Sequence, residues 1–159
     1  MKIKLLLLGK TTSAAIDELC KDYQKRISRY CKFEIEIIDN AKIKAQTPAL
    51  QNQAEADLIL NKIEDNAFLI LLDEKGKTFS SVEFAGQLTD WMNRSISNYV
   101  FLVGGAYGFD KSIYERASFQ LCLSKMTFSH QIIRPLFLEQ LYRAFSIIRN
   151  EPYHNEGRK

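Results

Sequence analysis

The chain has 159 residues, of which 46% are hydrophobic and 26% charged, and its formal net charge is +3. A chain of this length and ordinary composition is predicted to form a single domain over residues 1–159, with roughly two thirds of its unfolded surface buried. No apolar run approaches the ~20 residues of a membrane span. The N-terminus has no long apolar region or small-residue cleavage site, which disfavours a secretory leader, and a cytoplasmic location is expected.

Cysteine and histidine offer little material for metal or thiol chemistry. Cys20, Cys31 and Cys122 show no metal-type spacing, which indicates reduced, structural thiols. His130 and His154 are the only histidines, so no protein-held zinc site or other metal site is expected. Neither histidine is paired in sequence with a recognisable nucleophile, which disfavours hydrolase chemistry.

The predicted elements alternate between strand and helix. Apolar runs and helical periodicity indicate, in chain order, strand 2–8, helix 13–29, strand 33–38, helix 48–65, strand 67–72, helix 81–94, strand 99–103, helix 111–117, strand 119–123 and helix 136–150.

This alternation predicts an α/β fold with a mostly parallel sheet. The first, third and fourth strands are almost continuously apolar, as expected when helices cover both faces of a sheet. Residues 33–36 alternate between apolar and acidic side chains, which indicates an edge strand. Open parallel sheets bind ligands beyond the carboxyl ends of their strands, and that rule selects the loops 72–77, 104–110 and 123–128.

The glycine motifs fit no nucleotide fingerprint. Gly9-Lys10-Thr11 and Gly76-Lys77-Thr78 both lack the earlier glycine of a P-loop, so they are interpreted as chance turns. Residues 104–108 (GGAYG) have the wrong spacing for a dinucleotide fold. Their glycines indicate either a plain tight turn or a place where a flat ligand lies against the main chain.

The C-terminal part of the chain carries the charge asymmetry. Residues 125–159 hold six basic and three acidic side chains, whereas residues 1–124 hold 16 of each. A basic end fits a nucleic-acid partner without establishing one. Basic residues also recur at helical spacing near the end of the first helix, as a phosphate-contacting face or a solvated surface would have them. They are Lys21, Lys25, Arg29 and Lys32, with Arg26 alongside them.

The last helix and the loop before it complete the pattern. A buried stripe is expected at Leu138, Leu141, Phe145 and Ile148, with Glu139, Arg143, Ser146 and Asn150 off it. Phe137 and Tyr142 add flanking apolar surface, which indicates a homodimer interface. Residues 124–127 (SKMT) either read an adenine edge through their main chain or form an ordinary loop with Met126 in the core.

Three segments together resemble one family closely, over the full length of the chain. They are VGGAYGFD at residues 103–110, LSKMTFSHQIIRPLFLEQLYRAFSIIRNEPYH at 123–154 and GKTTS at 9–13. The family is RlmH, the SPOUT-class 23S rRNA pseudouridine N3-methyltransferases. Two departures are that Ser129 stands where many members have proline and that residues 157–159 extend past the usual tail.

The resemblance implies a trefoil-knotted SPOUT α/β fold, a homodimer and S-adenosylmethionine as cofactor. It also implies methyl transfer to N3 of a pseudouridine in a 23S rRNA stem-loop of the large subunit, on assembled ribosomes. The matching cofactor-binding positions are Leu72, Gly104, Leu123, Ser124, Lys125, Met126, Thr127 and Phe128.

The tail supplies the candidate catalytic residues. Tyr153 is expected to stack on the base or hydrogen-bond to it. His154, of the same chain or of the partner subunit, is expected to accept the N3 proton directly or through a water. The alternative is a substrate-ordering role without proton transfer. Two other functions stay open at this point: a non-enzymatic module that binds nucleotides or ribosomes, and a related SPOUT enzyme with another target.

Overall fold

The fold is that of a computed structural model, which describes residues 1–154; the tail extension 157–159 lies outside the described residues. Five parallel strands form one sheet in the order β2-β1-β4-β3-β5. The strands are β1 (Lys2–Leu8), β2 (Lys32–Ile38), β3 (Phe68–Thr78), β4 (Asn98–Val103) and β5 (Phe119–Cys122). The α/β class and the parallel sheet are therefore confirmed.

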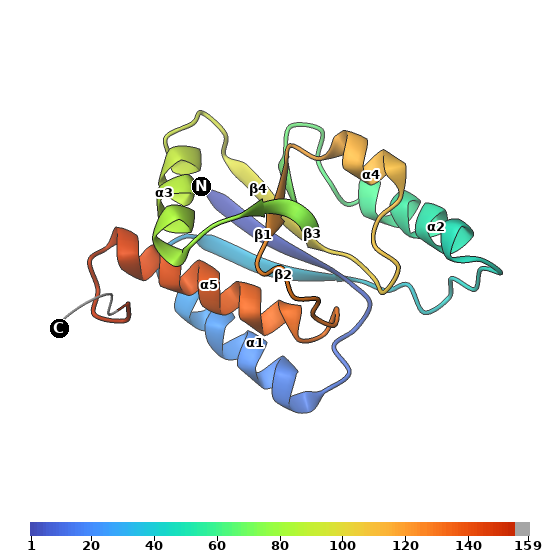
Figure 1. The fold of residues 1–159 in the computed structure, drawn as a ribbon, viewed down its shortest axis with the longest axis horizontal. Helices are drawn as coiled ribbons and strands as arrows, with labels where there is room; N and C mark the ends of the chain where they lie inside the picture. Colours follow the sequence, from blue (N-terminus) through green and yellow to red (C-terminus); the bar gives the residue numbers. More distant parts are fainter. Residues whose placement is uncertain (155–159) are drawn as a thin grey trace.

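Helices cover both faces of the sheet, as expected (Figure 1). The helices are α1 (Ala14–Ile27), α2 (Pro48–Leu60), α3 (Ser81–Met92), α4 (Lys111–Arg116) and α5 (Ile133–Ile148). Successive strand residues point to opposite faces, so β1 sends Ile3, Leu5 and Leu7 toward α1, α3 and α5, and Leu6 and Leu8 toward α2 and α4. Two buried clusters result, one on each face.

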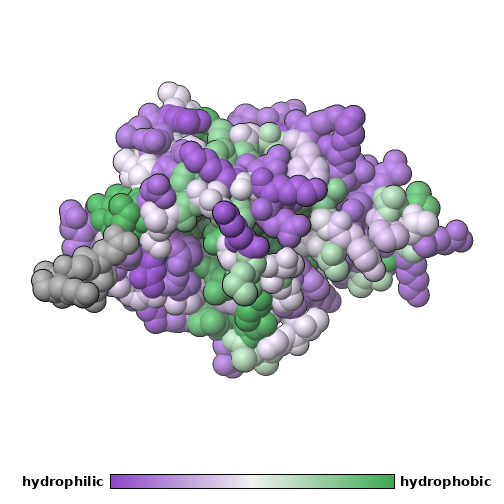
Figure 2. Space-filling view, viewed as in Figure 1, coloured by the Kyte–Doolittle hydropathy of each residue, from purple (hydrophilic) through white to green (hydrophobic). Residues whose placement is uncertain are grey.

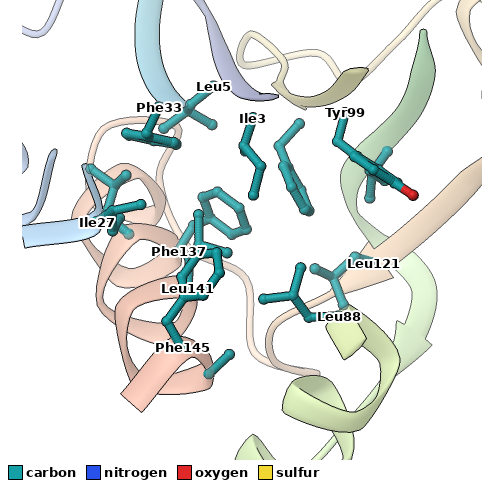
Figure 3. Close-up of a cluster of buried hydrophobic side chains, with 14 of the residues drawn as sticks. Ile3, Leu5, Ile27, Phe33, Leu88, Tyr99, Leu121, Phe137, Leu141 and Phe145 are labelled. Atoms are coloured by element: carbon teal, nitrogen blue, oxygen red, sulfur yellow. The ribbon is translucent and has the colours of Figure 1, made fainter. Parts of the chain in front are cut away.

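The larger cluster is packed mainly by α5. Figure 3 shows Ile3 beside Phe137 of α5, with Tyr99 and Leu121 farther across the same cluster. Phe137 is fully buried, so the expectation that it adds surface beside the helix stripe is wrong; its ring lies 4.7 Å from that of Phe101. Ser146 is also fully buried rather than off the stripe. Its hydroxyl donates to the Tyr142 carbonyl at 3.1 Å, which satisfies this buried polar group.

Strand β2 lies at the edge, as its alternating sequence predicts. Its solvent face carries acidic side chains that pair with lysines of the neighbouring strand. Lys2 lies 3.0 Å from Glu34, and Lys4 lies 2.6 Å from Glu36. Charged pairs of this kind also discourage the edge from pairing with another sheet.

Strand β3 differs most from its predicted bounds, because it continues to Thr78 and meets β5 twice. Leu121 of β5 is paired both with Leu72 and with Lys77. A strand residue has only two hydrogen-bonding edges, so β3 must cross from one edge of β5 to the other between Leu72 and Lys77. Gly76 lies at this crossing, where an added Cβ would come 2.6 Å from the Gln120 carbonyl carbon. The interpretation of Gly76-Lys77-Thr78 as a chance turn is therefore wrong.

The helix ends follow local chemistry. Helix α5 begins at Ile133, three residues earlier than expected, and includes Pro135 in its first turn, where the missing N–H costs nothing. The chain leaves this helix through Asn150, which has a φ of 55°. Helix α2 ends at Leu60 rather than near residue 65. The other boundaries lie within two residues of the prediction, apart from the far end of β3.

Candidate active site

A cleft of about 830 Å³ opens at the carboxyl ends of β3, β4 and β5. The three loops that the strand-end rule selects line it together, over residues 72–75, 103–109 and 121–130 without Lys125. Neighbouring parallel strands end at the same edge of the sheet, so these distant parts of the sequence meet there. In Figure 1 this edge lies beside the start of α5.

Seven of the eight expected cofactor positions line this cleft. They are Leu72, Gly104, Leu123, Ser124, Met126, Thr127 and Phe128. Lys125 is exposed and does not line the cleft. Met126 is 75% exposed, so the alternative that it packs in the core is wrong.

The glycine turn forms the wall on the β4 side. Gly105 and Gly108 form an antiparallel bridge, and Gly108 has a φ of 75°, a conformation that glycine adopts without strain. An added Cβ at Gly104 would lie 2.7 Å from Cε1 of Phe109. The space that Gly104 leaves therefore holds the Phe109 ring, rather than being left free for a ligand.

Tyr114 of α4 connects this wall to the loop at residues 72–75, because it contacts Phe109 on one side and Asp73 on the other. The ring of Phe109 meets that of Tyr114 edge-on at 5.9 Å, and the Tyr114 hydroxyl donates to Asp73 at 2.6 Å. Burial and this hydrogen bond raise the pKa of Tyr114 well above its usual range, so the phenol stays protonated as a donor.

The third loop is braced from within and from the β3 loop. The hydroxyl of Ser124 accepts a hydrogen bond from the Met126 backbone N–H at 3.0 Å. The Thr127 hydroxyl donates to Glu74 at 3.3 Å, which joins the first and third loops across the cleft.

Arg134 is a supporting residue that the sequence did not single out. Its side chain is fully buried, and its guanidinium donates to the carbonyls of His130 (2.9 Å) and Leu8 (3.0 Å) and to the Thr11 hydroxyl (2.8 Å). Gln131 adds bonds to the Lys10 carbonyl and the Thr12 N–H. The segment at residues 9–12 thus anchors the end of the cleft loop that leads into α5. One indication of this contact is present in the sequence: residues 9–13 and 123–154 are both among the segments that resemble the RlmH family.

Tyr153 and His154, called the tail below, lie far from the cleft of the same chain. His130 and Ile133, at the start of α5, line the cleft, whereas Tyr153 and His154 follow the end of this helix at Ile148. Sixteen helical residues at 1.5 Å each separate the two regions by about 24 Å. The structure therefore does not bring the candidate catalytic residues and the cofactor positions together in a single chain.

At the end of α5 the tail is held by polar contacts. The Tyr153 hydroxyl lies 3.1 Å from Glu139 and 3.2 Å from the Tyr23 hydroxyl. The Arg143 guanidinium lies over the Tyr153 ring at 4.9 Å and reaches His154 Nδ1 at 3.3 Å. Burial, the contact with Tyr23 and the Glu139 carboxylate raise the pKa of Tyr153 well above its usual range.

The basic side chains of α1 are partly neutralised by acidic side chains of the same helix. Lys21 lies 2.6 Å from Asp17, and Arg26 lies 2.8 Å from Asp22. Intrahelical pairs of this kind favour the solvated-surface interpretation over a phosphate-binding face at these two positions. Within residues 1–154, no helix is long and apolar enough to cross a membrane.

Comparison with known proteins agrees with this architecture. A family profile described as "Predicted SPOUT methyltransferase" matches residues 1–154. A solved structure described as "The structure of a probable methylase family protein from Haemophilus influenzae Rd KW20" superposes with a TM-score of 0.57 and 12% identity, over 99% of this chain and 72% of that one. At this identity the likeness shows a shared fold. The chain belongs to the SPOUT methyltransferase family.

Curated relatives place it more narrowly. Proteins named "Ribosomal RNA large subunit methyltransferase H" are 49% identical over 157 residues in Flavobacterium johnsoniae and 45% identical over 156 residues in Cytophaga hutchinsonii, covering 98% of this chain and 100% of each relative. The namesake from Clostridium beijerinckii is 41% identical over 160 residues, covering 97% of this chain and 99% of that protein. Within the family the chain thus groups with the RlmH proteins.

Proposed function

We propose that this protein methylates N3 of a pseudouridine in a 23S rRNA stem-loop of the large subunit, with S-adenosylmethionine as the methyl donor and assembled ribosomes as the substrate. The observation that carries the proposal is the single cleft built from three strand-end loops in a SPOUT-family chain. The names of the relatives support large-subunit rRNA as the substrate class. A ribosomal substrate also places the protein in the cytoplasm.

The donor would lie in the cleft against Leu72, Gly104 and the loop 123–128. The residues fit such a group: backbone amides and carbonyls of the loop can read an adenine edge, and the aliphatic side chains of Leu72 and Leu123 offer apolar surface. When bound, the donor supplies an electrophilic methyl group. The crossing of β3 over β5 also supports the knotted topology, in which one segment of the chain passes across another near the cofactor site.

A homodimer would complete the site, because one chain separates its tail from its own cleft. Exposed apolar side chains support an interface on α1, α5 and the loop before α5. Leu19 is 46% exposed, Ile132 41% and Leu136 38%. Figure 2 shows apolar side chains gathered on the face where α5 crosses α1. Pairing through this face would let the tail of one subunit approach the cleft of the other.

In the reaction, the N3 proton must leave as the nitrogen attacks the methyl group. The raised pKa of Tyr153 keeps its phenol neutral, so Tyr153 would orient the base by stacking or by donating a hydrogen bond. Histidine is the side chain best suited to accept a proton near neutral pH, which assigns the proton-accepting role to His154. Arg143 contacts both residues and would hold the tail in shape.

The function is tested by label transfer and base mapping. Purified protein is mixed with labelled S-adenosylmethionine and ribosomes that lack the modification, and the labelled nucleotide is located in the RNA. The expected result is label at N3 of one pseudouridine. An isolated stem-loop should be a poor substrate, because residues 1–154 form one sheet with its covering helices and no second module that could bind free RNA. Label at another nucleotide indicates a different SPOUT enzyme. Ribosome binding without donor binding in calorimetry indicates a passive module.

The role of His154 is tested by the pH profile of methyl transfer. A general base acts in its deprotonated form, so the wild-type rate should rise with pH, and His154→Gln should be slower with this rise removed. Tyr153→Phe is the companion variant, because it keeps the ring and removes the hydroxyl. A His154→Gln profile of unchanged shape would leave His154 with an ordering role alone.

A further inference from the structure

Tyr107 differs from the other tyrosines because its ring is exposed and contacts no other ring in the part of the chain that the structure describes. All seven tyrosines lie within the described residues. Six of them are at least partly buried and have a hydroxyl or ring contact, as at Tyr23, Tyr30, Tyr99, Tyr114, Tyr142 and Tyr153. Tyr107 is 62% exposed, and among residues 1–154 its side chain has no hydrogen-bond or ring partner. An isolated exposed ring is ordinary on a protein surface, so its surroundings decide what it means.

The backbone under this ring is held firmly. Gly105 and Gly108 bridge across the turn, and the Gly108 N–H donates to the Gly105 carbonyl at 3.4 Å. From α2, the side-chain amide of Asn52 donates to the Tyr107 carbonyl at 3.0 Å. The main chain at Tyr107 is thus fixed from two sides while its ring projects without a partner. Such an arrangement lowers the entropic cost of binding a ligand to the ring.

The turn that carries Tyr107 is also a wall of the cofactor cleft. Tyr107 lines the cleft together with Met126, which is 75% exposed. A large exposed aromatic side chain at a cleft that has to receive a second substrate is well placed to meet that substrate.

The chemistry of the acceptor favours an aromatic surface here. N3 belongs to the pairing edge of the base, so the base must be unpaired and turned out of its stack before it can reach a methyl donor. Such a base loses its neighbours in the RNA. A tyrosine ring can replace them, because base–aromatic stacking is favourable for every base.

We infer that Tyr107 is a substrate-positioning residue whose ring stacks on an unpaired RNA base, either the acceptor or its neighbour, at the mouth of the cleft. This inference rests on the proposed function, since it takes RNA as the second substrate. It adds a contact from the β4 turn of the subunit that holds the donor, distinct from the contacts that the tail would provide.

Three variants test the inference. Tyr107→Leu removes the aromatic face and keeps an apolar side chain, whereas Tyr107→Phe keeps the ring. Met92→Ala is the control, because Met92 is 42% exposed and lies far from the cleft. It ends α3, which leads to the amino end of β4, whereas the cleft lies at the carboxyl ends of the strands. For each protein we would measure kcat/KM for ribosomes, equilibrium binding to ribosomes with the demethylated donor present, and the Kd of S-adenosylmethionine.

The expected result is a loss of about five- to hundred-fold in kcat/KM and in ribosome affinity for Tyr107→Leu, in line with one base stack. Tyr107→Phe, the control variant and the donor Kd of all the variants should match the wild type. Equal ribosome affinity and kcat/KM for Tyr107→Leu and wild type would overturn the inference. So would a parallel loss of donor affinity, or a change in oligomeric state on sedimentation, since either would assign the ring to another partner.

Failure of the proposed function gives a different pattern. If the wild type binds ribosomes without transferring a methyl group, methylation is refuted while the binding comparison still decides the role of Tyr107. If the wild type neither binds nor methylates ribosomes, both proposals fall.

Discussion

Single glycines show how strongly one position depends on its neighbours in space. At Gly76, β3 passes so close to β5 that a Cβ would come 2.6 Å from the Gln120 carbonyl carbon and 2.7 Å from its oxygen. Backbone atoms cannot rotate away as a side chain can. Gly86, in the middle of α3, has nothing within 4 Å of its Cβ position. The same substitution therefore has opposite consequences at the two sites.

Gly76→Ala is expected to destabilise the protein by about 1–3 kcal/mol, because the overlap has to be relieved by moving one of the crossing strands. Gly86→Ala is the matched control and should stabilise the protein by up to about 1 kcal/mol, because alanine is the better helix former. The free energy of unfolding from denaturant titration measures both. A Gly76→Ala protein as stable as the wild type would mean that the crossing is looser than the structure shows.

At the scale of elements, the edge strand β2 is held to β1 partly by charge. Glu36 accepts a hydrogen bond from Lys4 at 2.6 Å and lies 3.1 Å from Lys62. The bond from Lys4 and the contact with Lys62 hold the pKa of Glu36 below its usual range, against the opposing effect of partial burial. A carboxylate with a lowered pKa adds stability above its unfolded pKa, and this contribution is lost as the pH falls through the folded pKa.

Glu36→Gln should therefore cost at most about 1 kcal/mol at neutral pH. The difference from the wild type should shrink once the pH falls below about 4.3, the ordinary glutamate value. Thermal or denaturant unfolding across the acid range checks this. Glu18→Gln is the control, because Glu18 is exposed on α1 and forms no salt bridge within residues 1–154. A Glu36→Gln deficit that is the same at all pH values would rule out the charge pair as its cause.

In the whole molecule, α5 separates Tyr153 and His154 from the cleft of the same chain. Mixed dimers of two defective chains can therefore test whether the tail of one subunit serves the cleft of the other. A dimer that pairs the tail of one chain with the cleft of the other can be rebuilt from two defective chains. One chain would carry Tyr153→Ala with His154→Ala. The other would carry Gly104→Val, whose side chain would overlap the Phe109 ring and disturb the cleft.

Each defective chain alone should be inactive. Co-expression of the two should restore up to about a quarter of the wild-type rate, because half of the randomly paired dimers are mixed and each mixed dimer has one intact site. Methyl transfer to ribosomes is the measurement, with sedimentation to verify pairing. Mixed dimers without activity would show that tail and cleft must belong to the same chain.

The order of residues along the chain is enough to predict the α/β class, the strands and helices, and the loops that line the cleft. The strands and helices follow from apolar periodicity, which is visible in neighbouring residues. The loops then follow from the rule that parallel strands present their carboxyl ends together. The eight cofactor positions came from the family resemblance, and the structure places all but Lys125 along the cleft.

Contacts between segments that lie far apart in the sequence could be learned only from the three-dimensional structure. It revealed the crossing at Gly76, the filling of Gly104's space by Phe109, the anchoring role of Arg134 and the separation of Tyr153 from the cleft. The physical reason is that periodicity records whether a side chain is buried, whereas these features depend on which segment it is buried against. That choice is made by the packing of the whole chain.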